Sequence, residues 1–160
     1  MSRLLIMRHG EAAPGFPDAK RPLTTRGEYE VAAMAAWLAG RVEQGELARP
    51  KMYASPYVRA QQTAGLMGQA LGCTVETLGF ITPDDDPSEV VEWLLTQPEG
   101  APMLLVSHMP LVGELAGRLL EGRPGQGVGF ATAALAELEA DVWASGCARL
   151  RRFTEPGQLG

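Results

Sequence analysis

The sequence predicts an α/β protein: a three-layer α/β/α sandwich with a mostly parallel central sheet and an antiparallel edge strand. Two observations predict this class. Short apolar runs alternate with longer stretches that carry helix start and stop signals over residues 4–120. Two strand-like segments then follow each other near the C-terminus, which favours an antiparallel pair at one edge of the sheet.

Length and composition predict one domain over residues 1–160, since 46% of the chain is hydrophobic and 21% is charged. The net charge of -5 argues against non-specific binding to nucleic acid or to anionic membranes, so an anion site must be a local group of arginines. Cys73 and Cys147 have neither zinc-site nor redox-motif spacing and predict reduced thiols. Because the sequence shows no signal peptide and no membrane-length apolar run, a cytoplasmic location is expected.

The first predicted elements are a buried strand and a long helix. Leu4–Met7 is an uninterrupted apolar run that ends at Arg8, as a strand buried on both faces does. Thr25 and Glu28 have the spacing of a capping box, which predicts a helix from Thr25 to about Gly40. Its predicted buried face consists of four apolar residues at helical spacing: Tyr29, Ala33, Ala36 and Trp37.

The next elements continue the alternation of strand and helix. Lys51–Ala54 predicts a second strand, and the helix after it ends at Gly72. Thr74–Thr77 predicts a third, short strand. Asp86 is a suitable N-cap for a helix that continues through Gln97.

The remaining segments complete the predicted sheet. Met103–Val106 is the strongest strand candidate in the chain, and a helix follows from about Leu111 to Leu120. The glycine-rich stretch 122–129 neither follows a strand nor opens a clear helix, so we interpret it as a loop rather than a phosphate cradle. Ala133–Ala140 and Cys147–Phe153 are the two strands predicted to form the antiparallel pair.

Polar side chains directly follow three of the predicted strands. Arg8 and His9 follow the first strand, Ser55 follows the second with Arg59 one helical turn later, and His108 follows the fourth. Because the carboxyl ends of parallel strands meet at the same edge of a sheet, we expect these side chains to share one pocket. The chain has only two histidines, and both lie at these strand ends.

This set of residue types predicts phosphoryl chemistry. Guanidinium groups match phosphate oxygens with paired hydrogen bonds, and a neutral imidazole can attack phosphorus. A second histidine can donate hydrogen bonds to the phosphoryl oxygens, which carry the charge of the transition state. Two histidines are too few for a metal site, and Ser55 and Ser107 lack the G-x-S-x-G turn of a serine hydrolase. The remaining alternative is that both histidines are buried structural groups.

At these residues the sequence resembles the histidine phosphatase superfamily, which has the phosphoglycerate-mutase-like fold. Three blocks carry the resemblance: Arg8-His9-Gly10, Ser55-Pro56 with Arg59-Ala60-x-x-Thr63, and Ser107-His108-x-Pro110. Within the superfamily the chain is most similar to the small phosphohistidine phosphatases of the SixA type. That closer similarity lies in three stretches and covers roughly residues 4–135: Met7–Ala12, Arg21–Thr24 and Ser107–Gly113.

The resemblance implies a phosphatase that uses no metal and no organic cofactor. His9 would be the nucleophile and form a phosphohistidine intermediate, while Arg8, Arg59 and His108 would hold the phosphoryl group. The expected substrate is phosphohistidine on a signalling protein, such as a histidine phosphotransfer domain. A phosphatase of small phosphate monoesters is the first alternative, and a non-catalytic phosphate-binding module is the second.

The expected general acid is missing from the sequence. Many relatives carry a glutamate ahead of the third block, whereas the corresponding segment here, Gly79–Pro83, contains none. Asp18 is the preferred substitute, with Asp84 and Asp85 as alternatives, and Glu11 is expected only to orient its loop. For each of these residues the competing interpretation is a solvated loop carboxylate.

Overall fold

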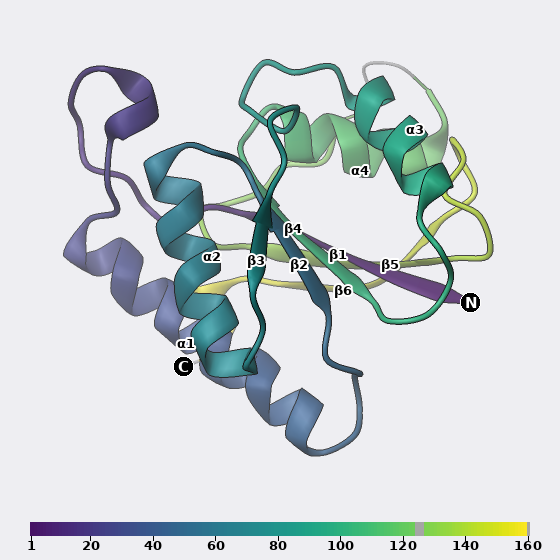
Figure 1. Cartoon of the computed structure of the whole chain (residues 1–160), viewed down its shortest axis with the longest axis horizontal. Coiled ribbons are helices and arrows are strands. Elements are labelled where there is room, and N and C mark those ends of the chain that lie inside the picture. Colours follow the sequence, from purple (N-terminus) through teal and green to yellow (C-terminus); the bar gives the residue numbers. More distant parts are fainter. Residues whose placement is uncertain (124–126, 160) are drawn as a thin grey trace.

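The computed structural model describes residues 1–123 and 127–159 and contains one six-stranded sheet (Figure 1). The spatial order of the strands is β3-β2-β4-β1-β5-β6. Strands β3, β2, β4 and β1 are parallel, and β5 runs antiparallel to both β1 and β6. The predicted class is therefore confirmed. The strands are β1 (Ser2–Arg8), β2 (Lys51–Ala54), β3 (Val75–Thr77), β4 (Met103–Ser107), β5 (Leu135–Ala140) and β6 (Arg149–Thr154).

Helices cover both faces of the sheet. Helices α1 and α2 pack on one face, and α3 and α4 pack on the other (Figure 1). Two short 3-10 turns, η1 before α1 and η2 near the C-terminus, lie outside the layers of α-helices. The bounds of these elements are η1 (Asp18–Lys20), α1 (Thr25–Glu43), α2 (Val58–Leu71), α3 (Pro87–Thr96), α4 (Leu111–Glu121) and η2 (Pro156–Gln158).

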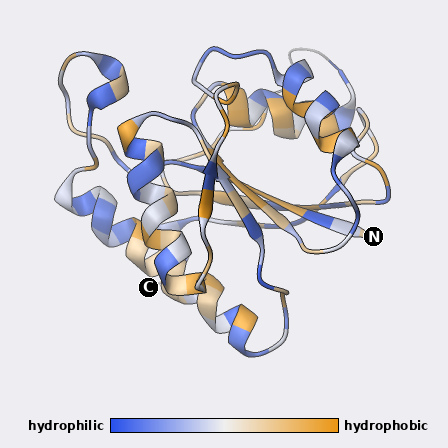
Figure 2. Cartoon of the chain, in the orientation of Figure 1, coloured by the Kyte–Doolittle hydropathy of each residue, from blue (hydrophilic) through white to orange (hydrophobic). Residues whose placement is uncertain are grey.

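Strand β1 contributes to both cores, which explains its continuous apolar run. Leu4 and Ile6 belong to the core under α3 and α4, whereas Leu5 and Met7 belong to the core under α1 and α2. All four are fully buried, and Figure 2 shows hydrophobic colour along the central strands. Burial of each such side chain contributes roughly 1.5–3 kcal/mol. The two cores hold the carboxyl end of β1 rigidly between the layers of helices.

Helix α1 begins at the predicted place but buries a different face. Its N-cap is Thr24 rather than Thr25, and the Thr24 hydroxyl accepts a hydrogen bond from the Gly27 amide. A Cβ at Gly27 would lie 2.2 Å from the Glu11 carbonyl oxygen, so this turn of the helix packs against the loop after β1. Tyr29 comes two residues after Gly27, which is a rotation of about 200° around the helix axis. Its side chain therefore points away from that contact and is 77% exposed. The predicted face was wrong for Tyr29 and Ala36, which are exposed, while Trp37 packs against the edge of the core. The buried residues of α1 are Gly27, Val31, Met34, Ala35, Leu38 and Arg41.

The predicted signals at two other helix ends are confirmed. Gly72 ends α2 in the left-handed conformation with φ 70°, and the Asp86 carboxylate accepts a hydrogen bond from the Ser88 amide at the start of α3. In the glycine-rich stretch 122–129, residues 124–126 lie outside the described residues, and the others form neither helix nor strand. Throughout residues 1–123 and 127–159, each helix is too short or too polar to cross a bilayer.

Candidate active site

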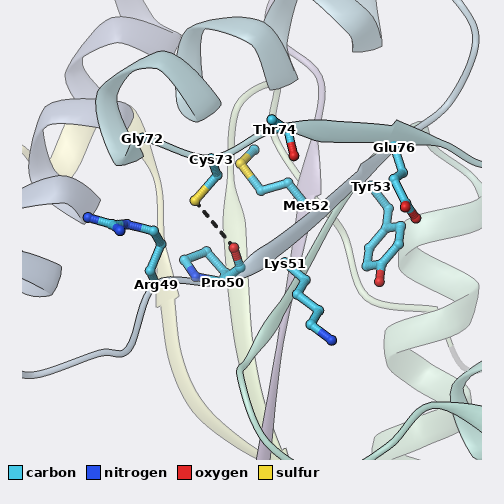
Figure 3. A pocket seen from close by; sticks show the side chains of 9 residues that line it. All are labelled: Arg49, Pro50, Lys51, Met52, Tyr53, Gly72, Cys73, Thr74 and Glu76. Carbon is cyan, nitrogen blue, oxygen red and sulfur yellow. Dashed lines mark hydrogen bonds between the residues drawn. The ribbon is translucent and has the colours of Figure 1, made fainter.

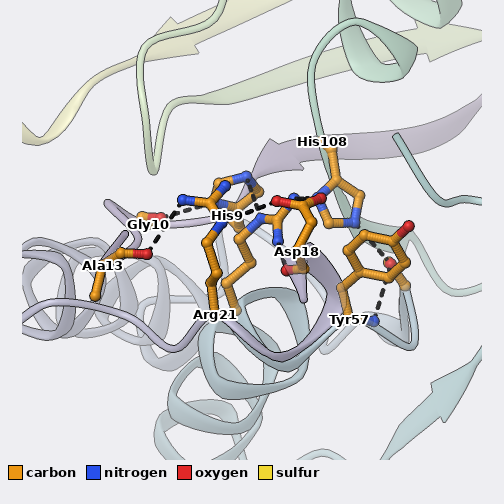
Figure 4. A network of polar contacts seen from close by, with 9 residues as sticks. His9, Gly10, Ala13, Asp18, Arg21, Tyr57 and His108 are labelled. Carbon is orange, nitrogen blue, oxygen red and sulfur yellow. Dashed lines mark hydrogen bonds and ion pairs between the residues drawn. The ribbon is translucent and has the colours of Figure 1, made fainter. Parts of the chain in front are cut away.

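Three adjacent strands end at the same edge of the sheet and bring the sequence-predicted residues together. Strand β4 lies between β1 and β2, and the register pairs Arg8 with Ser107 and Ala54 with Val106. The residues that follow these strands, His9, Ser55 and His108, therefore become neighbours. The two imidazole ring centroids are 5.1 Å apart (Figure 4).

His9 is buried, with 6% of its surface exposed, and its protonation is fixed locally. Its Nδ1 lies 2.7 Å from the carbonyl oxygen of Gly10. Because a carbonyl oxygen can only accept a hydrogen bond, Nδ1 carries the ring proton and Nε2 carries a lone pair. The Arg59 Nε–H group donates to this Nε2 atom at a longer distance of 3.3 Å. The nitrogen that can act as a nucleophile therefore faces a guanidinium group.

Burial and nearby positive charges keep His9 neutral. Burial is the largest cause that lowers the pKa of His9 to about 4, and Arg59, Arg8 and Arg21 lower it further, while the hydrogen bond to Gly10 opposes this shift. At neutral pH the imidazole is therefore uncharged, so its Nε2 lone pair is available.

His108 is held by a hydrogen bond from the end of β2. Its Nε2 lies 2.7 Å from the Ser55 hydroxyl oxygen, which also accepts a hydrogen bond from the Tyr57 amide at 3.2 Å. Burial, followed by the neighbouring His9 and Arg59, lowers the pKa of His108 to about 3, so the ring is neutral. The Ser55 hydroxyl accepts from the Tyr57 amide and donates its own proton to His108 Nε2, so the proton of the neutral ring is on Nδ1. Among the described residues, this buried Nδ1 atom has no hydrogen-bond partner.

Two arginines supply the positive charge of the site. Arg59, 4% exposed, lies over the Tyr57 ring at 5.1 Å from its centroid. Arg8 donates from Nη1 to the Phe130 carbonyl at 2.8 Å, and its buried Nε atom has no hydrogen-bond partner within the described part of the chain. Burial and the charge of Arg59 lower the pKa of Arg8, but a guanidinium group starts so high that it stays charged.

Asp18 lies in η1 and is bound to the site through Arg59. The Arg59 Nη1 group donates to the Asp18 carbonyl oxygen at 2.7 Å, and Nη2 donates to its carboxylate at 3.1 Å. The other carboxylate oxygen accepts from Arg21 Nε at 2.8 Å (Figure 4). The hydrogen bond from Arg21, followed by that from Arg59, holds the pKa of Asp18 below its usual range. The carboxylate is therefore ionised at neutral pH and accepts a hydrogen bond from an Arg59 donor of the kind that also binds phosphate oxygens.

The other candidate carboxylates have different surroundings. Asp84 and Asp85 line a separate hollow beside Glu114, and the Asp85 carboxylate accepts hydrogen bonds from the Thr82 amide and hydroxyl. Glu11 accepts a hydrogen bond from the Thr24 hydroxyl at 2.9 Å, which links the loop after β1 to the start of α1. This contact fits the orienting role expected for Glu11.

A buried threonine joins the first two sequence blocks. The Thr63 hydroxyl accepts a hydrogen bond from the Gly10 amide at 3.1 Å and donates to the Arg59 carbonyl at 2.8 Å. A Cβ at Gly10 would lie 2.7 Å from Val31 Cγ2, so only glycine fits between the loop and α1. Together these contacts set the position of His9 relative to Arg59.

A second hollow, of about 380 Å³, lies at the opposite end of β2 (Figure 3). It is lined by Arg49–Tyr53 and Gly72–Thr74 together with Glu76, and contains neither of the two histidines. The Cys73 thiol donates to the Pro50 carbonyl at 3.3 Å, and burial raises its pKa. Over residues 1–123 and 127–159, there is no group of three or more His, Cys, Asp or Glu side chains that could hold a metal ion.

The chain is similar in sequence and in fold to known histidine phosphatases. The family model for the histidine phosphatase superfamily (branch 1) matches residues 4–79. The chain is 37% identical over 149 residues to the phosphohistidine phosphatase SixA of Escherichia coli (strain K12), covering 90% of this chain and 89% of that protein. A SixA homolog of Haemophilus influenzae is 33% identical over 84% of this chain and 86% of its own length. The solved structure of the protein histidine phosphatase SixA complexed with tungstate superposes with a TM-score of 0.84 at 34% identity, covering 99% of both chains.

Proposed function

The chain belongs to the histidine phosphatase superfamily, and from that premise we propose that it hydrolyses phosphohistidine on a phosphotransfer protein, with His9 as the nucleophile. The observation that carries this proposal is the hydrogen bond from His9 Nδ1 to the Gly10 carbonyl, because it leaves an unprotonated Nε2 beside the Arg59 guanidinium. The names of the relatives from Escherichia coli and Haemophilus influenzae support the choice of substrate class.

The reaction takes place in two displacements at phosphorus. In the first, His9 Nε2 forms a bond to phosphorus while the bond from phosphorus to the substrate imidazole breaks, and the leaving ring keeps its electron pair and is neutral once its far nitrogen holds a proton. In the second, water attacks phosphorus, the bond to Nε2 breaks, and inorganic phosphate is released. Arg8, Arg59 and the Nδ1–H group of His108 donate to the phosphoryl oxygens in both steps.

The surroundings of Asp18 favour phosphohistidine over phosphate monoesters. An alkoxide leaving group must be protonated at the bridging oxygen itself, for which a positioned acid contributes roughly 10²–10⁴-fold. Hydrogen bonds from Arg21 and Arg59 hold the pKa of Asp18 below its usual range, so its carboxylate is ionised at neutral pH and is a poor proton donor. An imidazole leaving group takes its proton at the far ring nitrogen, where water can supply it. A weak acid is therefore sufficient for a phosphohistidine phosphatase.

The direct test is to trap the phosphorylated enzyme. Brief reaction with a ³²P-labelled phosphohistidine protein, followed by a base quench, should leave an acid-labile, base-stable label on the wild type and none on His9→Asn. The matched control is His108→Asn, which removes the other histidine and should still be labelled, although more slowly. Label that persists on His9→Asn would assign the nucleophile to another residue.

A substrate panel tests the leaving-group class separately. We expect kcat/KM for phosphoimidazole and for a phosphorylated histidine phosphotransfer domain to exceed kcat/KM for alkyl phosphate monoesters. The opposite order would favour the alternative, a phosphatase of small monoesters. The assignment of His9 as the nucleophile depends on the labelling experiment and would not change.

A further inference from the structure

The loop between β1 and α1 carries an exposed aromatic side chain beside the candidate active site. Phe16 is 97% exposed, more than Tyr29 at 77% or Met1 at 73%, the next most exposed large hydrophobic residues in the described part of the chain. Its neighbours Pro14, Gly15 and Pro17 are also exposed, so the tip of the loop is an apolar knob without a charge. In Figure 1 this purple loop projects beyond the ends of α1 and α2.

The knob is held in place rather than hanging freely. At its base the Ala13 amide donates to the Pro22 carbonyl at 2.8 Å, and Ala12 forms an antiparallel bridge with Leu23. Arg21 crosses the loop and donates from Nη1 to the Ala13 carbonyl at 3.1 Å. These bonds lower the entropy that the loop loses when another surface packs against it, which favours binding.

The knob is also continuous with the site. Asp18, two residues after Phe16, is bound to Arg59 through its carbonyl and its carboxylate, and Arg59 donates to the proposed nucleophile His9. Two residues of extended chain span only about 7 Å. A folded protein that brings a phosphorylated side chain to Arg59 and His9 therefore comes within reach of Phe16, whereas a phosphorylated imidazole alone is too small to contact both.

We propose that the Phe16 knob is the docking element for the protein that carries the phosphohistidine, and that it packs against apolar side chains beside the phosphorylated residue. This inference rests on the proposed function. An apolar contact suits this chain, because its net charge of -5 gives no general attraction to an anionic phosphoprotein. Partial burial of one phenylalanine is sufficient for about a tenfold gain in affinity, which corresponds to 1.4 kcal/mol.

The test compares two substrates with the same leaving group. For Phe16→Ser we expect kcat/KM for a phosphorylated histidine phosphotransfer domain to fall about tenfold, mostly through KM, and kcat/KM for phosphoimidazole to change less than twofold. Phe16→Leu keeps an apolar side chain and should retain most of the activity on the phosphoprotein. The matched control is Leu95→Ser, since Leu95 is 50% exposed and lines a hollow with Ser2, at the far end of β1 from His9.

The outcomes separate this inference from the proposed function. If Phe16→Ser lowers kcat/KM equally for both substrates, or for neither, the docking role is wrong and the proposed function stands. If the wild type hydrolyses phosphoimidazole but not the phosphoprotein, the docking role and the proposed protein substrate are both wrong, and only the phosphoryl chemistry at His9 stands. If the wild type hydrolyses neither, both proposals fail. Self-association of the wild type that Phe16→Ser abolishes, with no effect on the phosphoprotein reaction, would assign the knob to a second copy of this chain and overturn the inference.

Discussion

Protonation of two buried histidines should make this protein sensitive to mild acid. The pKa values of His9 and His108 are lowered to about 4 and about 3, whereas an unfolded histidine titrates near 6.5. Between these values the unfolded chain binds protons that the folded chain does not, so the free energy of unfolding falls as the pH falls. The contribution is fully present above pH 6.5 and is lost as the pH approaches the folded values.

The size of the effect follows from these values. From pH 7.5 to pH 5.0 each histidine lowers the free energy of unfolding by about 2 kcal/mol, so the pair lowers it by about 4 kcal/mol. This is a large part of the 5–15 kcal/mol that is typical of a whole domain. The chain has no other histidine, and its carboxylates contribute mostly below pH 5, because their unfolded pKa values are about 4. The change in the free energy of unfolding between pH 7.5 and 5.0 therefore comes mainly from these two side chains.

Urea denaturation followed by the fluorescence of the three tryptophans measures this loss directly. His9→Asn should lose about 2 kcal/mol between pH 7.5 and 5.0 instead of 4, and the double variant with His108→Asn should lose almost nothing. The comparison is between two pH values of the same variant, so a change in stability common to both values does not affect it. A wild-type free energy that stays constant over this window, or a double variant that loses as much as the wild type, would refute the assignment of neutral buried rings.

Two further predictions concern the groups around the histidines. Asp18→Asn should lower the inhibition constant of inorganic phosphate by about three- to fivefold, as expected for loss of one exposed competing charge. The same variant should lower kcat/KM for alkyl monoesters more than for phosphohistidine. An unchanged inhibition constant would mean that Asp18 and phosphate do not compete for Arg59. Ser55→Ala should lower kcat about tenfold with little change in KM, because His108 loses the hydrogen bond that sets its tautomer; a loss confined to KM would contradict that positioning role.

The four central site residues could be predicted because their positions depend on rules that act along the sequence. Arg8, His9 and His108 directly follow apolar runs, and the ends of parallel strands meet at one edge whatever the loops do. Arg59 follows one helical turn after Ser55. Their contacts depend instead on partners that carry no sequence signal, such as the Phe130 carbonyl that accepts from Arg8 across 122 residues.

The buried face of α1 was predicted wrongly because periodicity alone does not fix the rotation of a helix. Small and aromatic residues at helical spacing suggested one face, but the close contact of Gly27 with Glu11 rotates α1 so that Tyr29 faces solvent. A glycine inside a predicted helix was the available signal, since it permits this close approach. Only the position of the preceding loop makes that signal interpretable.

Charged residues of the antiparallel pair show the same dependence on long-range contacts. Glu137 in β5 is 1% exposed and forms ion pairs with Arg3 and with Arg41, which is 96 residues earlier in the chain. In β6, Arg149 and Arg151 both form ion pairs with Glu139 of β5. The sequence places these residues on strands, but it cannot indicate that carboxylates would be buried there and neutralised from another layer.

Unsatisfied hydrogen bonds separate the parts of this protein that serve stability from the part that serves binding. In the described residues three buried side-chain nitrogen atoms have no hydrogen-bond partner: Arg8 Nε, Arg41 Nε and His108 Nδ1. Arg41 Nε still has Glu46 at 3.4 Å, whereas the other two atoms belong to the candidate active site. A buried donor without a partner costs about 1–3 kcal/mol, and a phosphoryl oxygen that reaches it removes this cost. Within residues 1–123 and 127–159, the two buried side-chain nitrogen atoms with no protein group to accept from them or donate to them therefore both belong to the candidate active site, where an oxyanion can supply the partner.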